Sequence, residues 1–223
     1  MNIKPDKIIR TNRKTISLQI TQDAKLVVRV PNLLTDKELD KILIKHKNWI
    51  ERKIKKMQER IDLRTKKEFV NGEGFLYLGK FYKLHIVEAQ ARSLIFDGGF
   101  YLSKNYLPKA REEFVKWYKK KAHEVIPQRV EFYARMYGYS YNKVRITRAQ
   151  KRLGSCSYKG NLNFSWRLIM APIEVIDYVV VHELAHLEVR NHSKRFWSKV
   201  KLMMPDYKQR VGWLKRNNHL LIL

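Results

Sequence analysis

The sequence predicts an α+β protein, because strand patterns fill most of the first hundred residues and helical patterns fill most of the remainder. Residues 15–21 alternate between polar and apolar side chains, which is the period of a half-buried strand. From Ala110 to about Tyr137 the apolar residues instead recur at helical spacing. This change of pattern predicts two parts, a strand-rich one over residues 1–105 and a helix-rich one over residues 106–223.

The first part is expected to hold a β-hairpin, one long helix and further strands. The hairpin turns at residues 22–25. A helix capped by Thr35 or Asp36 follows, and its apolar stripe extends to Met57 opposite a strongly basic face. Residues 60–67 are polar and charged, which is typical of a connector. Further strands are expected at residues 75–78, 81–87, 93–96 and 100–102.

The second part is expected to begin with a long helix that Pro127 kinks or restarts and that Gly138 ends. Residues 143–147 and 161–165 have strand patterns, and the loop at residues 153–160 between them is rich in Gly and Ser. We expect the two strands to form a short antiparallel hairpin that packs beside the helix that follows. That next helix carries the residues that say most about function.

The composition is typical of a globular protein of the cytoplasm. The chain has 223 residues, 44% of them hydrophobic, which suffices for one compact core or for a catalytic domain with a smaller partner. Its single cysteine, Cys156, excludes an internal disulfide and agrees with a reducing compartment. The first residues lack the apolar core of a signal peptide, and no apolar run approaches the roughly 20 residues of a membrane span. We therefore expect a cytoplasmic protein with no membrane partner.

The net charge of +26 and the pI of about 10.1 favour anionic partners, such as nucleic acid, nucleotides or an acidic protein. The alternative is that the lysines only solvate exposed helix faces. A dedicated nucleic-acid-binding protein is the less favoured interpretation, because most aromatic residues occupy core spacings and no named binding motif is present.

A His-Glu-x-x-His motif, from His182 to His186, is the most informative stretch of the chain. On a helix, positions i and i+4 lie on one face, so the two histidines can share one metal ion. Apolar neighbours at helical spacing predict a buried helix, and such a helix rarely carries two histidines and a glutamate without paired use for them. Glu183 stands where zinc hydrolases with this motif place the residue that holds the attacking water and takes its proton.

His192 lies six residues after His186 and is predicted to be the third metal ligand. The helix is expected to stop near Arg190 and the chain to turn at Asn191, since Asn tolerates the left-handed conformation that such a turn needs. This spacing equals that of the metzincins, which carry Gly where this chain has Val189. Three histidines with an open fourth position predict a catalytic site for one Zn²⁺ ion per chain.

Several stretches along the chain together form the motifs of one family. They are Gly154-Ser155-Cys156-Ser157 with residues 161–168, residues 180–187, Asn191-His192-Ser193, Phe196-Trp197 and, more weakly, residues 13–16, 49–50 and 77–80. In these motifs the chain resembles the YgjP-like metallopeptidases, relatives of the SprT-like and WLM zinc proteases. The resemblance implies a zincin-like catalytic part in which His182, His186 and His192 bind the metal and Glu183 is the catalytic glutamate. Family members usually have Trp where this chain has Leu153, which bears on the shape of the nearby loop.

The first functional hypothesis is a zinc-dependent peptidase that pairs a polypeptide substrate with an edge strand of residues 143–165. Its oxyanion donor is left open among Arg152, Tyr158 and Tyr207. The second hypothesis keeps the metal but takes a nucleotide or phosphate ester, and it ranks lower because no aspartate cluster accompanies the histidines. A nucleic-acid-associated binding protein is the third. Cys156 is expected to shape its loop, because the histidines that could activate it are committed to the metal.

Overall fold

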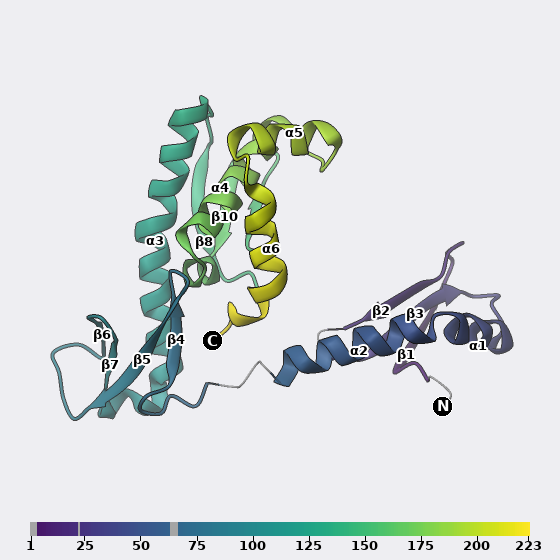
Figure 1. The fold of residues 1–223 in the computed structure, drawn as a ribbon, viewed down its shortest axis with the longest axis horizontal. Helices are drawn as coiled ribbons and strands as arrows, with labels where there is room; N and C mark the ends of the chain where they lie inside the picture. Colours follow the sequence, from purple (N-terminus) through teal and green to yellow (C-terminus); the bar gives the residue numbers. More distant parts are fainter. Residues whose placement is uncertain (1–3, 22, 63–66) are drawn as a thin grey trace. The chain divides into compact units, whose positions relative to one another are not determined.

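The computed structural model describes residues 4–21, 23–62 and 67–223, and it divides into two compact units, Met1–Thr65 and Lys66–Leu223 (Figure 1). The division lies well before residue 105, where the sequence pattern changes, because the strands of residues 74–103 pack into the core of the second unit. Gln22 of the expected hairpin turn and residues 63–66 of the expected connector lie outside the described residues. Within the described ranges, no helix is both long and apolar enough to cross a lipid bilayer.

The first unit contains the expected hairpin and one strand that the sequence pattern did not predict. Strands β2 (Ser17–Ile20) and β3 (Leu26–Pro31) pair antiparallel, which confirms the hairpin. Strand β1 (Lys7–Thr11) adds parallel to β3 and gives the sheet order β1-β3-β2. The alternate residues of β3 that face the helices are fully buried, as the period of a half-buried strand requires.

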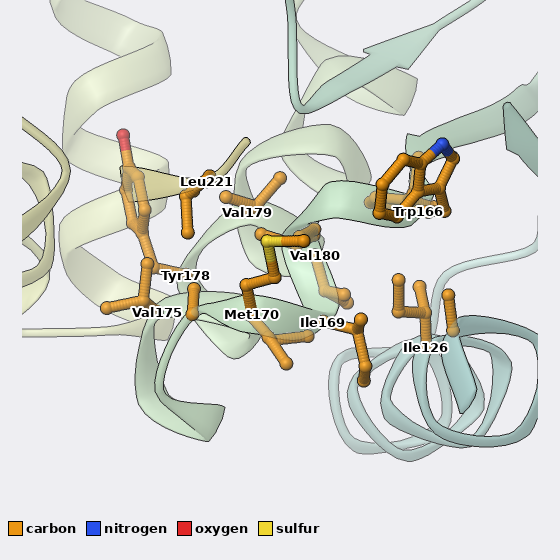
Figure 2. Packing of buried hydrophobic residues seen from close by; sticks show 14 of the residues in the cluster. Ile126, Trp166, Ile169, Met170, Val175, Tyr178, Val179, Val180 and Leu221 are labelled. Atoms are coloured by element: carbon orange, nitrogen blue, oxygen red, sulfur yellow. The ribbon is translucent and has the colours of Figure 1, made fainter. Parts of the chain in front are cut away.

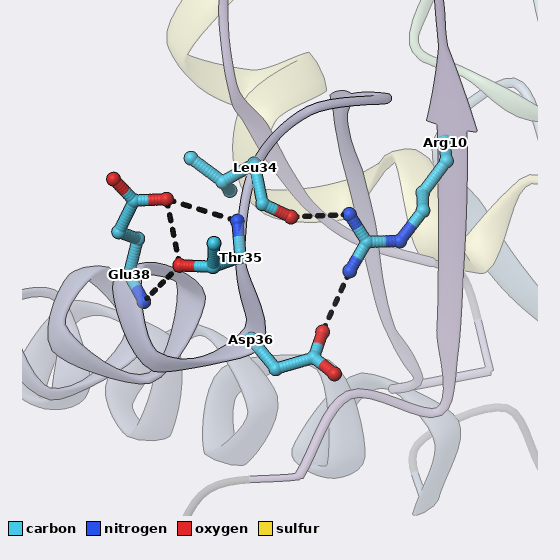
Figure 3. Close-up of polar contacts among 5 residues, drawn as sticks. All are labelled: Arg10, Leu34, Thr35, Asp36 and Glu38. Carbon is cyan, nitrogen blue, oxygen red and sulfur yellow. Dashed lines mark hydrogen bonds and ion pairs between the residues drawn. The ribbon is translucent and has the colours of Figure 1, made fainter.

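The single long helix expected in the first unit is wrong, because two helices occupy that range. Helix α1 (Asp36–Lys45) and helix α2 (Lys47–Asp62) meet at His46, whose φ of −101° and ψ of 9° leave the helical region. The start of α1 agrees with the expected cap: Thr35 and Glu38 form a reciprocal capping box, and Arg10 of β1 pairs with Asp36 at 2.6 Å (Figure 3).

The second unit opens with four strands where the sequence pattern predicts them. Strands β4 (Gly74–Tyr77) and β5 (Lys80–Val87) form one antiparallel hairpin, and β6 (Leu94–Phe96) and β7 (Phe100–Ser103) form another. Parallel pairing of β5 with β7 joins the hairpins in the order β4-β5-β7-β6. A 3₁₀ turn η1 (Lys104–Lys109) leads from this sheet to the next helix.

Helix α3 (Ala110–Tyr137) is the longest element and runs through Pro127 as one helix. Gly138 ends it with a φ of 69°, which confirms the expected C-cap. The helix buries one stripe against the four-stranded sheet, where the rings of Phe114 and Phe75 stack at 4.1 Å between centroids. This aromatic contact is part of the reason why the strands before residue 105 belong to the second unit.

A small three-stranded sheet lies before the histidine helix, and its pairing corrects the expected hairpin. Strands β8 (Lys143–Thr147) and β10 (Asn161–Ser165) occupy the predicted positions but run parallel. The antiparallel partner of β10 is β9 (Gly154–Cys156), which forms inside the loop and gives the order β8-β10-β9. The chain therefore leaves β8, places β9 at the far edge and returns through Gly160 to the central strand.

Helix α4 (Ile173–Glu188) contains the histidine motif and is buried along most of its length. A 3₁₀ turn η2 (Trp166–Met170) precedes it, and Pro172 is its N-cap, one position before the expected first turn. Apolar residues of α4 pack with Trp166, Ile169 and Met170 and with Ile126 of α3 (Figure 2). The helices that follow are α5 (Lys194–Met203), α6 (Tyr207–Asn217) and the 3₁₀ turn η3 (Asn218–Leu220).

An ion pair fixes α4 against α3 in the same core. Arg129 donates from Nε to Oδ1 of Asp177 at 2.6 Å and from Nη2 to Oδ2 at 2.7 Å, a bidentate geometry. The hydroxyl of Tyr133 donates to Oδ2 at 3.2 Å. Because the Asp177 residue is only 6% exposed, its carboxylate depends on these donors rather than on water.

We expect Asp177→Asn to lower the free energy of unfolding of the protein by about 2 kcal/mol, since one charge of a partly buried, hydrogen-bonded pair is lost. Chemical denaturation followed by circular dichroism measures this loss. Glu124→Gln is the control, because Glu124 pairs with Lys121 on the surface of α3 and such pairs contribute less than about 1 kcal/mol. Equal losses in the two variants would contradict the role given to Asp177.

Candidate metal centre

Three histidine side chains converge at the end of α4. The Nε2 atom of His192 lies 3.0 Å from Nε2 of His182 and 3.2 Å from Nε2 of His186. Among the described residues, these three form a group able to hold one metal ion, with ligand atoms all within 4.8 Å of one another. The expectation that His192 swings back toward the helix motif is therefore matched by the geometry.

Two of the imidazole rings are oriented by contacts at their second nitrogen. Nδ1 of His186 lies 3.0 Å from the carbonyl oxygen of Val189, which accepts a hydrogen bond from the ring and leaves Nε2 with its lone pair. Nδ1 of His182 lies 3.4 Å from the hydroxyl of Tyr178, one turn earlier on α4. Burial lowers the pKa of His182 to about 3 and also lowers the pKa of His186, so both rings are kept neutral.

The turn that returns His192 differs from the expected one. Helix α4 ends at Glu188, and Val189 takes an extended conformation with φ −122° and ψ 104°. Asn191 does not adopt a positive φ; its side-chain oxygen instead accepts from the backbone N–H of Ser193 at 3.3 Å. A β-branched residue favours the extended conformation, so the chain turns here without the glycine of the metzincins.

Aromatic rings of α5 form a wall behind the three histidines. The ring of Phe196, which is fully buried, stacks on His186 at 4.4 Å between centroids. The indole of Trp197 stacks on His192 at 5.8 Å. In the sequence, both aromatic residues belong to a family motif without a predicted role, and their placement limits how the imidazoles can rotate.

Glu183 follows the first histidine and is an almost buried carboxylate, 5% exposed. Burial raises its pKa to about 8, while the charge of Arg152 and a hydrogen bond from the backbone N–H of Cys156 act in the opposite direction. Its Oε2 atom has no hydrogen-bond partner among the described residues. An unpaired polar atom is costly to bury, which indicates that Oε2 interacts with a group that is not part of the chain itself.

Strand β9 passes so close to Glu183 that only glycine fits at the contact. A Cβ added to Gly154 would lie 2.5 Å from Oε1 and 2.8 Å from Cγ of Glu183. Cys156, two residues further along β9, supplies the backbone donor to the same carboxylate. The strand that the sequence pattern missed therefore determines the position of Glu183.

Arg190 connects the histidine turn to the β9–β10 hairpin. Its guanidinium donates to the carbonyl oxygen of Ser157 at 2.8 Å and to that of Tyr158 at 3.1 Å. It also lies over the ring of Tyr158 at 5.4 Å from the centroid. One side chain thus links the element that carries His192 with the hairpin that contacts Glu183.

The remaining residues singled out in the sequence lie around this cluster. Cys156 is half-buried, and its thiol lies 3.5 Å from the carbonyl oxygen of Ser157, outside the histidine group. Tyr207 stacks on Trp197 at 5.6 Å, and Tyr158 is 90% exposed. Arg152 lines a pocket of about 210 Å³ on the small sheet, together with Thr147, Ala149, Gly154, Ser155, Asn163 and Ser165.

Comparison with known proteins places the chain in a metallopeptidase family. The family description "YgjP-like, metallopeptidase domain" matches residues 14–217 of the chain. The chain therefore belongs to the YgjP-like family, which confirms the resemblance seen in its motifs. No curated protein gives a significant match.

Two solved structures of metallopeptidase zymogens resemble part of the chain. Abylysin of Pyrococcus abyssi is 24% identical with a TM-score of 0.38, and the match covers 41% of this chain and 94% of that one. Jannalysin of Methanocaldococcus jannaschii is 16% identical with a TM-score of 0.32, over 39% of this chain and 93% of that one.

Gly154→Ala tests the close contact between β9 and Glu183. We expect the added methyl group to lower the free energy of unfolding by about 1–3 kcal/mol, because neither the strand nor the buried carboxylate can move away freely. The measurement is urea denaturation. Gly212→Ala is the matched control, since a Cβ there meets only the flexible end of Arg216 at 3.4 Å. If Gly154→Ala were as stable as the control, strand β9 would be able to accommodate the methyl group without a loss in the free energy of unfolding.

Proposed function

We propose that the chain is a zinc-dependent peptidase whose three histidines, His182, His186 and His192, bind one Zn²⁺ ion and whose Glu183 is the general base. One observation carries this proposal: the Nε2 atoms of His182 and His186 on α4 lie together with that of His192, and the residue after His182 is a buried glutamate, Glu183, whose Oε2 has no hydrogen-bond partner among the described residues. Membership of a metallopeptidase family supports the metal and the polypeptide substrate.

The donor set fits zinc in number, chemistry and spacing. Tetrahedral zinc with imidazole nitrogens at about 2.0–2.1 Å separates those nitrogens by roughly 3.3 Å. The observed separations of 3.0 and 3.2 Å lie close to that value. Three imidazole nitrogen donors would leave a fourth position open, which is the arrangement of catalytic rather than structural zinc sites.

Bound zinc supplies Lewis-acid activation of a carbonyl group and of water. The chain itself supplies the proton transfers. Glu183 accepts a hydrogen bond from the attacking water at its free Oε2 atom, takes the proton and later passes it to the leaving amine. Gly154 and the backbone N–H of Cys156 hold the carboxylate in place during both transfers.

An extended polypeptide is the proposed substrate, and β9 is the element that would pair with it. This strand lies at the edge of the small sheet and contacts Glu183 through Gly154. Edge strands bind peptides through their free backbone groups. Arg152 and Tyr207 are the candidate oxyanion donors that lie near the centre.

A nucleotide or phosphate-ester substrate at the same metal is the second candidate, and the net charge of +26 favours it. The first candidate ranks above it because the described metal-ligand group contains no carboxylate, which multi-metal phosphatase sites usually recruit. The proposal has two further parts. A nucleic acid is a candidate partner of the basic faces of α1 and α2. A cytoplasmic location is consistent with the free thiol of Cys156.

The protein should contain about one zinc ion per chain when it is purified without added metal, and His186→Ala should lose most of it. The loss is expected because two ligands cannot replace three. Atomic emission measures the metal, and chelation should lower the melting temperature, since a ligand that binds only the folded state stabilises it. His123→Ala, on the exposed side of α3, should keep the wild-type zinc content. Zinc retained in full by His186→Ala would refute the ligand assignment.

Glu183→Gln should leave zinc content unchanged and slow peptide hydrolysis by about 10²-fold or more, because the amide keeps the shape of the side chain but cannot take a proton. The assay offers unfolded basic and acidic proteins and, separately, nucleoside triphosphates. Glu174→Gln, at the exposed start of the same helix, is the control. Wild-type rates in Glu183→Gln would make Glu183 structural, and hydrolysis of nucleotides alone would favour the second candidate.

A further inference from the structure

A pocket away from the histidines carries an unusual set of charges. It has a volume of about 530 Å³ and lies between β6 and the first half of α3. We propose that this pocket binds a compact organic polyphosphate, of the class of nucleoside di- and triphosphates, with its phosphates on the cations and its planar ring against the aromatic wall. The proposal concerns binding and does not depend on the chemistry at the histidines.

The cations come from one helix face and one loop. Lys116 and Lys120 of α3 are one turn apart, and Lys121 lies beside Lys120 on the same side of the helix. Arg92 approaches from the segment before β6. All four line the pocket, so their positive charges lie within the reach of a single ligand.

The acidic residue of the pocket does not neutralise these cations. Glu113 accepts from Nζ of Lys116 at 2.6 Å and from the hydroxyl of Ser93 at 2.5 Å, so each of its carboxylate oxygens already has a partner. Lys121 pairs with Glu124 at 2.7 Å. Arg92 and Lys120 are exposed and make no ion pair with any described residue. They are therefore available to an incoming anion.

The wall of the pocket is aromatic, which distinguishes it from a plain basic surface. Trp117 and Phe96 line it and contact each other at 5.3 Å between centroids. Trp117 is further fixed by the ring of Phe100 at 4.9 Å. A flat, immobilised indole beside cations suits a ligand that carries a planar ring next to its negative charge.

Charge and size favour a polyphosphate over an acidic peptide. Four cations against two paired carboxylates, Glu113 and Glu124, leave a surplus of two positive charges that a single carboxylate ligand cannot balance. A peptide with several carboxylates would extend over a groove, whereas about 530 Å³ is typical of a pocket for one small molecule. Phosphate oxygens also accept from several lysine and arginine donors at once.

The test is calorimetric titration of the full chain with ATP, inorganic tripolyphosphate, adenosine and a hexaglutamate peptide. We expect ATP to bind more tightly than tripolyphosphate or adenosine, because it alone uses both the cations and the ring. Lys120→Glu and Arg92→Glu should each raise the ATP dissociation constant by about tenfold or more. Lys201→Glu, an equal change of charge on the exposed side of α5, should change it by less than about twofold.

His186→Ala separates this site from the histidine centre and should bind ATP as the wild type does. Unfolding curves of each variant show that the exposed substitutions leave the fold intact. The proposal would be overturned if the wild type showed no detectable ATP binding. It would also be overturned if Lys120→Glu, Arg92→Glu and Lys201→Glu all bound ATP with the same affinity. It would also be overturned if hexaglutamate bound more tightly than ATP with the same sensitivity to these variants, which would assign the pocket to acidic peptides.

Discussion

The structure of the second unit depends on one constraint, which is that α4 must be buried while it carries an ionisable carboxylate. Removing a carboxylate from water costs several kcal/mol unless partners replace the water. Glu183 receives one backbone donor, and its Oε2 atom has no partner among the described residues, so part of that cost is not offset there. A cation held by the neighbouring imidazoles would offset it, since nearby positive charge favours the ionised form. Binding of a metal ion by these imidazoles would therefore stabilise the fold through this helix.

The elements around α4 hold it from several sides. Arg129 of α3 anchors its first half through Asp177, and the rings of Phe196 and Trp197 on α5 pack against the imidazoles at its end. Arg190 then links the turn beyond the helix to the β9–β10 hairpin. The contacts of Arg129 and Arg190 join residues far apart in the sequence, so the position of the histidine centre depends on α3 and on the β9–β10 hairpin as well as on α4.

The sequence predicts those parts of the centre that depend on local spacing. His182 and His186 are one turn apart on any helix, and the polar and apolar alternation located β5, β8 and β10. The parts that depend on distant contacts could not be predicted. Strand β9 pairs with β10 and packs beside α4, and the need for glycine at Gly154 is visible only once Glu183 occupies the adjacent space. The turn at Val189 differs from the expected one because Nδ1 of His186 donates a hydrogen bond to the carbonyl oxygen of Val189. This hydrogen bond stabilises the extended conformation of Val189.

In the proposed centre, three imidazoles and no protein sulfur surround one zinc ion. X-ray absorption at the zinc edge of the metal-loaded protein tests it most directly, because nitrogen and sulfur ligands differ in distance by about 0.2–0.3 Å. With His182, His186 and His192 as ligands, we expect a first shell of nitrogen and oxygen at about 2.0–2.1 Å, with the outer-shell scattering of three imidazole rings. A sulfur contribution at about 2.3 Å, which only Cys156 or a methionine could provide, or scattering from fewer than three imidazoles, would contradict it.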